Sequence, residues 1–342
     1  MNLWVVSFTE KGADLNLRLS EGLRSLGHTV SGYDKTGKKG LSLYSSLQTW
    51  AGDAFAKADG IIFIGACGIA VRAIAPYVRD KLTDPAVVVL DECAGFSIPI
   101  LSGHVGGANQ LAKEAAEITG AVLAVTTATD ANGKFAVDLW AKENKLTICE
   151  REKAKRISAA LLAGEKIGVK NRFSSQYPLP EPLPEGLEHQ ESGKIGFCVT
   201  LDEEERPFFH TLVLVPKIAV LGVGCRRDTA DSALEDAVLD ALKNAHLSLL
   251  AVKKVCTIDK KAEERAILNF CTKYGLPLET FSAQDLMDLP GEFSVSEFVR
   301  KTTGADNVCE RAAVLGSGNG ELLIKKQRYP SVTVAAALCW EK

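Results

Sequence analysis

Short hydrophobic runs alternate with helical patterns along the N-terminal part of the chain. The helical patterns are leucines spaced three or four positions apart between residues 15 and 26, and an alanine-rich stretch at 108–119. Runs that are hydrophobic at consecutive positions are typical of strands buried on both faces of a sheet. Such runs occupy residues 3–8, 60–66, 86–92 and 121–127. This alternation predicts an α/β fold with a mainly parallel, doubly wound sheet.

The same alternation returns in the C-terminal part of the chain. A strand and a glycine turn at 217–229 precede a helix from about Asp228, which carries Leu234, Val238 and Leu242 on one face. The pattern continues with a strand, a helix and a strand at 249–259, 260–273 and 276–281. Residues 312–324 predict a hairpin closed by glycines. Glu310 and Arg311 would then precede a strand and line the crevice of this second α/β unit.

The middle of the chain has a different composition and a different pattern of predicted elements. A charged helix is expected at 150–163, and the Pro/Glu-rich stretch 178–188 is incompatible with a helix or a central strand, so we expect an exposed loop there. The sequence therefore predicts an N-terminal α/β domain (1–148), a small middle module (149–215) and a C-terminal α/β domain (216–342).

Composition and charge narrow the function classes. The 342 residues carry a net charge of −3, so no overall basic field points to nucleic acid, and an anionic ligand must be bound by local groups. No hydrophobic run approaches the roughly 20 residues of a membrane span. Nine scattered cysteines lack a C-x-x-C pair, and five histidines lack H-x-H or H-E-x-x-H spacing. We expect free thiols in a reducing cytoplasm and no metal held by the protein.

The stretch LSGHVGGANQLA at 101–112 places His104 among glycines at the start of the helix 108–119. Glycine allows a tight turn or a close backbone approach to a ligand, and the first amides of a helix attract anions. The pattern predicts an anion site with a proton-transfer group beside it. The alternative is a hydrogen-bonded histidine of purely structural role. The candidate residues of this stretch are Gly103, His104, Gly106, Gly107 and Asn109.

Polar residues follow the strand at 86–92 and the strand at 121–127. Asp91 and Glu92 end the first of these, and Thr126 and Thr127 end the second. Ligands of doubly wound sheets bind beyond the carboxyl ends of the strands. A carboxylate beside the His104 imidazole would set its tautomer, and both groups could then share one water. Helix capping or a surface ion pair are the alternatives for the two acidic residues.

Residues 65–81 follow a strand and open a helix that ends near Pro76. Backbone amides in this turn could bind a carboxylate or an oxyanion, and nearby cations would add positive charge. The alternative is a tight turn followed by a solvated helix face. The candidate residues are Gly65, Ala66, Cys67, Gly68, Arg72, Arg79 and Lys81.

The stretch GVGCRRDT at 222–229 resembles a dinucleotide-binding turn, but Arg227 stands where the third glycine of G-x-G-x-x-G belongs. Adjacent arginines at a helix start suit a carboxylate, which guanidinium binds in bidentate fashion. Cys225 has no histidine nearby in sequence and is expected to be a packing residue and not a nucleophile. The candidate ligand-binding residues are Gly224, Cys225, Arg226 and Arg227, although one of the two arginines could simply be solvated.

The run 65–133 resembles the N-terminal part of the cobalt-precorrin-5A hydrolase family of anaerobic cobalamin biosynthesis. The segments GVGCRRDT, TIDKKAEE, LPLETFSAQDL, SVSEFV and VCERAAVL resemble its C-terminal domain, in the same order. The resemblance is weakest over 1–45 and 150–215, and Asp228 departs from the small residue or glycine more usual there.

This resemblance implies a hydrolase that opens the δ-lactone of cobalt-precorrin-5A and releases acetaldehyde to give cobalt-precorrin-5B. The implied partners are this polycarboxylate cobalt tetrapyrrole and neighbouring enzymes of the pathway. No cofactor is expected, since cobalt arrives within the substrate. On position and chemistry we assign water activation to His104 with Asp91 or Glu92, and the oxyanion to the amides of 65–68 or 106–107. The side chains assigned to substrate carboxylates are Arg72, Arg79, Arg226 and Arg227.

Two other functions are compatible with the sequence. An oxidoreductase could bind a dinucleotide on the turn at 222–224, although the missing third glycine argues against it. A non-catalytic carrier could bind the tetrapyrrole and pass it to another enzyme of the pathway. A carrier would change the absorbance of the pigment stoichiometrically but release no acetaldehyde.

Overall fold

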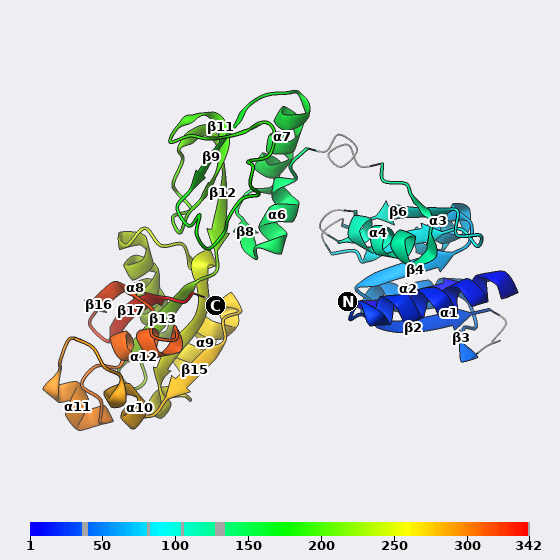
Figure 1. Cartoon of the computed structure of the whole chain (residues 1–342). Coiled ribbons are helices and arrows are strands. Elements are labelled where there is room, and N and C mark those ends of the chain that lie inside the picture. The colour runs from blue at the N-terminus through cyan, green and yellow to red at the C-terminus, as the bar shows by residue number, and fades with distance from the viewer. Residues whose placement is uncertain (36–39, 81–82, 104–105, 127–133, 341–342) are drawn as a thin grey trace. The chain divides into compact units, whose positions relative to one another are not determined.

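The computed structural model describes residues 1–35, 40–80, 83–103, 106–126 and 134–340. The chain divides into two compact units, Met1–Leu139 and Trp140–Lys342 (Figure 1). None of the helices in these described ranges is long and apolar enough to cross a bilayer.

Unit 1 is built on one seven-stranded sheet with the order β3-β2-β1-β4-β5-β6-β7. All neighbouring strands are parallel except β5 and β6. Its strands are β1 (Asn2–Ser7), β2 (Thr29–Asp34), β3 (Ser42–Leu43), β4 (Gly60–Ile64), β5 (Ala86–Leu90), β6 (Phe96–Leu101) and β7 (Val122–Leu123), and its helices include α1 (Glu10–Ser25), α2 (Leu47–Lys57), α3 (Cys67–Ile74) and α4 (Ala108–Thr119).

Helices cover both faces of this sheet. Leucines of α1 and alanines of α4 form one core with residues of β1, β4 and β5. Trp50 and the small residues of α2 and α3 form the core on the other face. Because β4 and β5 are buried at every position, their sequences are hydrophobic throughout. The predicted doubly wound α/β fold is confirmed.

One strand of unit 1 was not predicted. Residues 96–101, for which no element was predicted from the sequence, form β6, which runs antiparallel to β5. Pro99 in this segment argues against a strand, but the pairing register shifts between Val87 and Val88, next to Pro99, and proline is tolerated at such irregularities. β7 is parallel to β6, so its carboxyl end points away from the carboxyl end of β5. The prediction that the ends of 86–92 and 121–127 share one edge is therefore wrong.

The middle module of unit 2 has a five-stranded sheet with the order β10-β9-β11-β12-β8. The sequence analysis placed residues 146–148 in the N-terminal domain, but they form β8, which pairs with β12. The elements of this region are α6 (Val137–Glu143), β8 (Leu146–Ile148), α7 (Arg151–Leu162), β9 (Ile167–Asn171), β10 (Leu187–His189), β11 (Gly193–Val199) and β12 (Phe208–Pro216).

The C-terminal module has a five-stranded sheet with the order β15-β14-β13-β17-β16. Helices α8 and α9 pack on one face, and Val213 and Val215 of β12 join the same core. The second face is covered by α10 and α12. The elements are β13 (Ala219–Cys225), α8 (Asp231–Asn244), β14 (Val252–Ile258), α9 (Arg265–Tyr274), β15 (Leu278–Phe281), α10 (Ala283–Asp288), α11 (Glu297–Thr303), α12 (Cys309–Gly316), β16 (Leu322–Arg328) and β17 (Val332–Leu338), with short 3₁₀ turns at 249–251 and 259–261.

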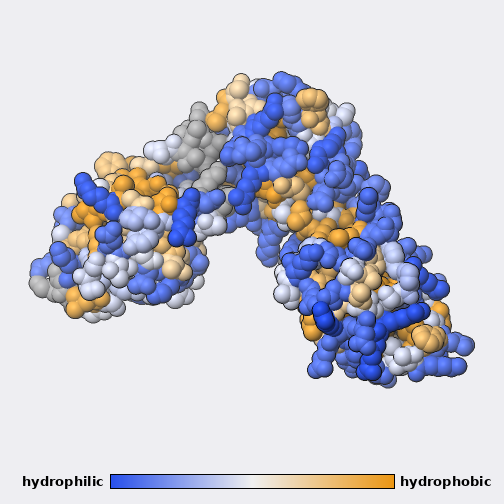
Figure 2. Space-filling view, turned by 180° about the vertical axis from the view of Figure 1, so that it is seen from behind, coloured by the Kyte–Doolittle hydropathy of each residue, from blue (hydrophilic) through white to orange (hydrophobic). Residues whose placement is uncertain are grey.

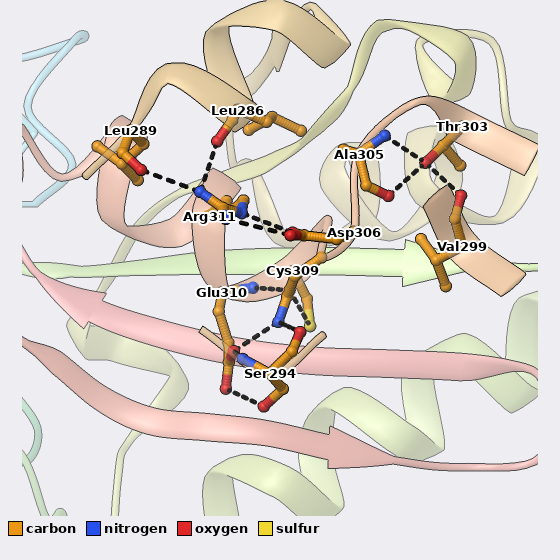
Figure 3. A network of polar contacts seen from close by, with 11 residues as sticks. Leu286, Leu289, Ser294, Val299, Thr303, Ala305, Asp306, Cys309, Glu310 and Arg311 are labelled. Carbon is orange, nitrogen blue, oxygen red and sulfur yellow. Dashed lines mark hydrogen bonds and ion pairs between the residues drawn. The ribbon is translucent and has the colours of Figure 1, made fainter. Parts of the chain in front are cut away.

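The prediction of a hairpin at 312–324 is wrong, because the first part of this segment belongs to helix α12. The alanines of this helix allow a close approach to the sheet: a Cβ on Gly222 of β13 would lie 1.7 Å from the carbonyl oxygen of Cys309. Glu310 and Arg311 lie in the first turn of α12 and are buried. They face a polar network inside the module and do not line a ligand crevice (Figure 3).

Candidate functional site

The best-placed candidate site of unit 1 lies at the sheet edge beyond the carboxyl ends of β1, β4 and β5. The strand order reverses between β1 and β4, since β1 leads to β2 on one side and β4 leads to β5 on the other. Doubly wound sheets bind ligands at such a switch point. Three connections meet there, at Phe8–Thr9, 65–68 and 91–93.

The turn at 65–68 is shaped by close packing. The amide of Gly65 donates to the carbonyl of Leu90 (2.9 Å), and a Cβ on Gly65 would lie 2.9 Å from the ring of Phe8. Helix α3 follows with Ala66 as N-cap, which provides no side-chain hydrogen bond. The first amides of α3, at Cys67 and Gly68, therefore remain available for an anionic group.

The two predicted arginines of this segment lie apart from each other. The guanidinium of Arg72 donates to the carbonyl of Gly68 (3.1 Å), which holds it beside the turn. Arg79 follows α3, and its amide donates to Asp84 (2.8 Å) shortly before β5 begins. Arg79 thus lies toward the amino end of β5, at the opposite edge of the sheet. Lys81 lies outside the described residues.

Asp91 caps the connection between β5 and β6. Its carboxylate accepts hydrogen bonds from the amides of Cys93 (2.9 Å) and Phe96 (2.6 Å). Partial burial would raise the pKa of this carboxyl, but backbone hydrogen bonds from Phe96, Gly95 and Cys93 outweigh it and lower the pKa below its usual value. A carboxylate held in this way is a weak base, and its hydrogen bonds serve the turn.

Glu92 is differently placed. Its Oε2 accepts a hydrogen bond from the hydroxyl of Thr9 (2.7 Å), and Thr9 also caps α1 by accepting from the amide of Gly12 (3.0 Å). Nearby, the ammonium of Lys11 lies 3.0 Å from the sulfur of Cys93. The hydrogen bond with Cys93, followed by the charges of Glu92 and Asp91, raises the pKa of Lys11. A carboxylate and a cation therefore lie together at this edge of the sheet.

Thr9 and Lys11 were missed by the sequence analysis. They follow a predicted strand and open a predicted helix, which is the same signal that singled out residues 65–68. Their importance depends on which strands are neighbours in the sheet, and a single sequence does not reveal that order.

His104 lies outside the described residues, as does Val105. The flanking loop is tight: Ser102 is left-handed (φ 56°), and a Cβ on Gly106 would lie 2.2 Å from the Cβ of Ser102. The amides of Ala108 and Asn109 donate to the carbonyls of Ser102 (3.1 Å) and Gly103 (2.9 Å). These two amides of α4 close the loop and are not free for an anion, whereas the oxyanion role of the amides of 106–107 stays a prediction.

The described residues that flank His104 do not lie beside Asp91 and Glu92. Leu90 pairs with Ser97, whereas Val87 pairs with Leu101 at the other end of β6. Four residue steps along a strand span roughly 13 Å, so the described flanks of His104 lie at the opposite edge of the sheet. Thr126 follows β7, which runs toward that opposite edge, and Thr127 is outside the described residues. The shared water expected for His104 and the acidic pair stays a prediction, because His104 lies outside the described residues.

A cleft of about 820 Å³ lies beyond the carboxyl ends of β13 and β14 in unit 2. Arg227 lines it, but Gly224, Cys225 and Arg226 are not among its lining residues. Within the described residues, Arg227 and Lys260 form no ion pair, whereas Lys261 pairs with Glu264 (2.6 Å). The lining residues are Arg227, Asp228, Thr229, Ala230, Asp231, Ser232, Lys260, Lys261, Glu263, Glu264 and Arg265.

Cys225 is half-buried, and burial raises the pKa of its thiol to about 11. At neutral pH the thiol is protonated, which supports a packing role. No group of three or more His, Cys, Asp or Glu suited to hold a metal ion occurs in the part of the chain that the structure describes.

Comparisons with known proteins cover nearly the whole chain. Three family models match consecutive segments: Cobalamin synthesis G N-terminal (49–130), Cobalamin biosynthesis central region (135–216) and Cobalamin synthesis G C-terminus (219–337). A cobalt-precorrin-5A hydrolase of Priestia megaterium is 32% identical over 98% of this chain and 94% of its own. One of Salmonella typhimurium is 36% identical over 83% of each chain. A solved cobalamin biosynthesis protein G homologue of Sulfolobus solfataricus is 20% identical, with 99% and 97% covered and a TM-score of 0.42.

Proposed function

Because this chain belongs to the cobalt-precorrin-5A hydrolase family, we propose that it opens the δ-lactone of cobalt-precorrin-5A and releases acetaldehyde to give cobalt-precorrin-5B. The observation that carries the proposal is the relationship to the Priestia megaterium hydrolase over 98% of this chain and 94% of that one. The scattered cysteines fit the cytoplasm as its location. Cobalt is part of the substrate, so the proposal needs no resident cofactor.

Lactone opening requires a base that takes a proton from the attacking water. We assign this role to Glu92. One of its oxygens is held by Thr9, which fixes the carboxylate and leaves the other oxygen for the water. Both oxygens of Asp91 accept backbone hydrogen bonds, so Asp91 serves the turn. The contribution of such a positioned base is typically 10²–10⁴-fold.

The tetrahedral intermediate needs donors for its oxyanion. The amides of Cys67 and Gly68 start α3 beside the end of β5, because Ile64 pairs with Leu90. Lys11, protonated at neutral pH, adds positive charge at the same edge of the sheet. Loss of one oxyanion donor typically costs about 3 kcal/mol of transition-state stabilisation.

The second step breaks a carbon–carbon bond. Water attack on the lactone carbonyl gives a free acetate side chain and a hydroxyl on the extruded carbon. Loss of that hydroxyl proton lets the carbon leave as acetaldehyde, while the electron pair of the broken bond goes to the conjugated ring and is taken up by a proton. Glu92, once protonated by the first step, is the group that can return a proton. Arg72 at the turn is suited to hold a peripheral carboxylate, and we propose Arg227 and Lys260 for the same task in their cleft.

The test is to incubate the protein with cobalt-precorrin-5A and to follow acetaldehyde with an alcohol dehydrogenase assay and the pigment by mass spectrometry. The hydrolase predicts catalytic release of acetaldehyde and a product lacking the extruded two-carbon fragment. A carrier would change the pigment spectrum stoichiometrically without acetaldehyde, and this result would overturn the proposal. The dinucleotide-binding alternative predicts a requirement for NAD(P)H, which the hydrolase lacks.

A further inference from the structure

The middle module carries a cluster of cationic groups that the proposed reaction does not use. In Figure 2, hydrophobic side chains gather on the visible face of unit 1, whereas hydrophilic residues predominate on unit 2. Within unit 2, a cleft of about 210 Å³ lies between α7 and the strands β11 and β12. Its polar lining consists of Arg156 from α7, Lys194 from β11, His210 from β12 and Glu165 from the connection after α7.

The charges of this cleft are unbalanced toward positive. Lys194 pairs with Glu165 (3.0 Å), the one acidic residue among the lining residues of the cleft. Arg156 forms no ion pair or hydrogen bond within the described residues. Lys153, one turn before Arg156 on α7, pairs with Glu150 outside the cleft. Among the described residues, the guanidinium of Arg156 and the imidazole of His210 thus line the cleft without an ion-pair or hydrogen-bond partner.

The titration of His210 reflects the same arrangement. Desolvation lowers the pKa of His210, and the nearby charges of Arg156, Lys194 and Lys153 lower it further. Glu165, the carboxylate that lines the same cleft, is paired with Lys194. An anion placed in the cleft would relieve the repulsion among the cations and favour the protonated imidazole.

An exposed aromatic ring adjoins these groups. Phe209 is 85% exposed, and its ring centroid lies 4.6 Å from that of His210 in an edge-on arrangement. An exposed phenyl ring beside a cationic cleft suits a ligand that combines a flat apolar ring with carboxylates. The cleft is smaller than typical pockets for whole ligands of drug size, at 300 Å³ or more. It can hold a carboxylate side chain, but not a macrocycle.

We propose that Arg156, Lys194 and His210 form a carboxylate-binding subsite of the middle module, with Phe209 against the ring that bears the carboxylate. The ligand class is a flat, conjugated macrocycle with peripheral carboxylates. Its identity as the tetrapyrrole of the pathway rests on the proposed function. The same cationic groups could bind a free anion such as citrate or phosphate, and the test separates these two sources.

The experiment uses the full chain with ¹³C-labelled histidine. The variant His210→Asn identifies which of the five histidine signals belongs to His210. Uroporphyrin, a stable flat macrocycle with a carboxylate on every side chain, is titrated in one series, and citrate and phosphate in another. We expect uroporphyrin to raise the pKa of His210 and to bind at least ten-fold more tightly than either free anion. The variants Arg156→Gln and Phe209→Ala should each weaken that binding by roughly ten-fold.

Arg151→Gln is the matched control, because Arg151 lies on the same helix and does not line the cleft. It should bind uroporphyrin as the wild type does. Equal binding of the free anions and of uroporphyrin would overturn the macrocycle as ligand, and an unchanged pKa of His210 with every probe would overturn the subsite itself. Thermal unfolding of Arg156→Gln checks that this variant folds. The uroporphyrin affinity of Phe209→Ala tests the subsite independently of Arg156→Gln.

Acetaldehyde release separates this proposal from the proposed function. If the wild type releases acetaldehyde and Arg156→Gln has an unchanged KM, the subsite is refuted and the hydrolase stands. If uroporphyrin shifts the pKa of His210 but cobalt-precorrin-5A yields no acetaldehyde, the subsite stands and the hydrolase is refuted. The two proposals predict together that Arg156→Gln raises KM about ten-fold and leaves kcat unchanged.

Discussion

Arg311 gives the sharpest test of the interpretation that the start of α12 serves stability and not ligand binding. Arg311 is a buried residue, with 7% of its surface exposed. It pairs with Asp306 (2.8 Å) and donates to the carbonyls of Leu286 and Leu289 (3.0 Å each), while the ring of Phe293 lies 4.5 Å from its Cζ. Figure 3 shows the ion pair with Asp306 and the two hydrogen bonds that join Arg311 of α12 to the end of α10.

Replacing Arg311 with methionine keeps the length of the side chain but removes its charge and its donors. Asp306, itself 7% exposed, then remains as a buried carboxylate without its partner. Breaking a buried ion pair on one side typically costs about 3–5 kcal/mol. For a unit of 150–250 residues, each kcal/mol corresponds to a shift of about 2–4 °C. We therefore expect the unfolding transition of unit 2 to fall by roughly 6–20 °C.

Differential scanning calorimetry measures this shift, and the double variant Asp306→Asn/Arg311→Met is its control. Because the double variant removes the orphaned charge, it should be more stable than Arg311→Met alone. Acetaldehyde release by the folded protein should stay within about two-fold of wild type, since Arg311 touches no ligand crevice. An unchanged transition together with a large loss of activity would refute the structural role and return Arg311 to the candidate site.

The remaining predictions concern a turn, a helix contact and two thiols. Because the pKa of Asp91 is lowered in the folded state, its ionised form stabilises the fold above the unfolded-state pKa, and this stabilisation is lost as the pH falls through the folded-state pKa. Asp91→Asn should therefore lower the free energy of unfolding at neutral pH but leave it nearly unchanged below about pH 3. Chemical denaturation at several pH values would show this difference. Gly222→Ala should lower the free energy of unfolding by about 3 kcal/mol or more, because its Cβ would lie 1.7 Å from a carbonyl oxygen of α12; a denaturation midpoint equal to that of wild type would contradict this contact. Iodoacetamide should modify the exposed Cys93 well before Cys225, because the pKa of about 11 keeps the Cys225 thiol protonated. Peptide mass spectrometry measures the order of modification. If Cys225 were modified first, burial would not control its reactivity.

The fold could largely be predicted where the local hydrophobic pattern alone identifies the helix or strand. The strands at 60–64 and 86–90 are buried on both faces, so their hydrophobic runs identify them, and the helix at 108–119 has the predicted bounds. The prediction failed where tertiary contacts decide the conformation. Pro99 argues against a strand, yet it is accommodated next to an irregular pairing of β5 and β6. The alanines of α12 fit a strand pattern equally well, and only their packing on Gly222 selects a helix.

The candidate site could be predicted only in part, for the same reason. The turn at 65–68 and Glu92 follow buried strands and lie at one sheet edge, as the strand pattern indicates. The unexpected direction of β6 places the residues around His104 at the opposite edge, and sequence spacing alone does not reveal this reversal. Lys11 and Thr9 join the site through the neighbouring positions of β1, β4 and β5 in the sheet.

The most direct test of the central claim is the rate of acetaldehyde release from cobalt-precorrin-5A by Glu92→Gln, with wild type and His104→Ala measured alongside. If Glu92 activates the water, Glu92→Gln loses roughly 10²–10⁴-fold in rate while its unfolding temperature stays close to that of wild type. Wild-type release by Glu92→Gln, with the loss found instead in a folded His104→Ala, would contradict the account and move the reaction to the opposite edge of the sheet.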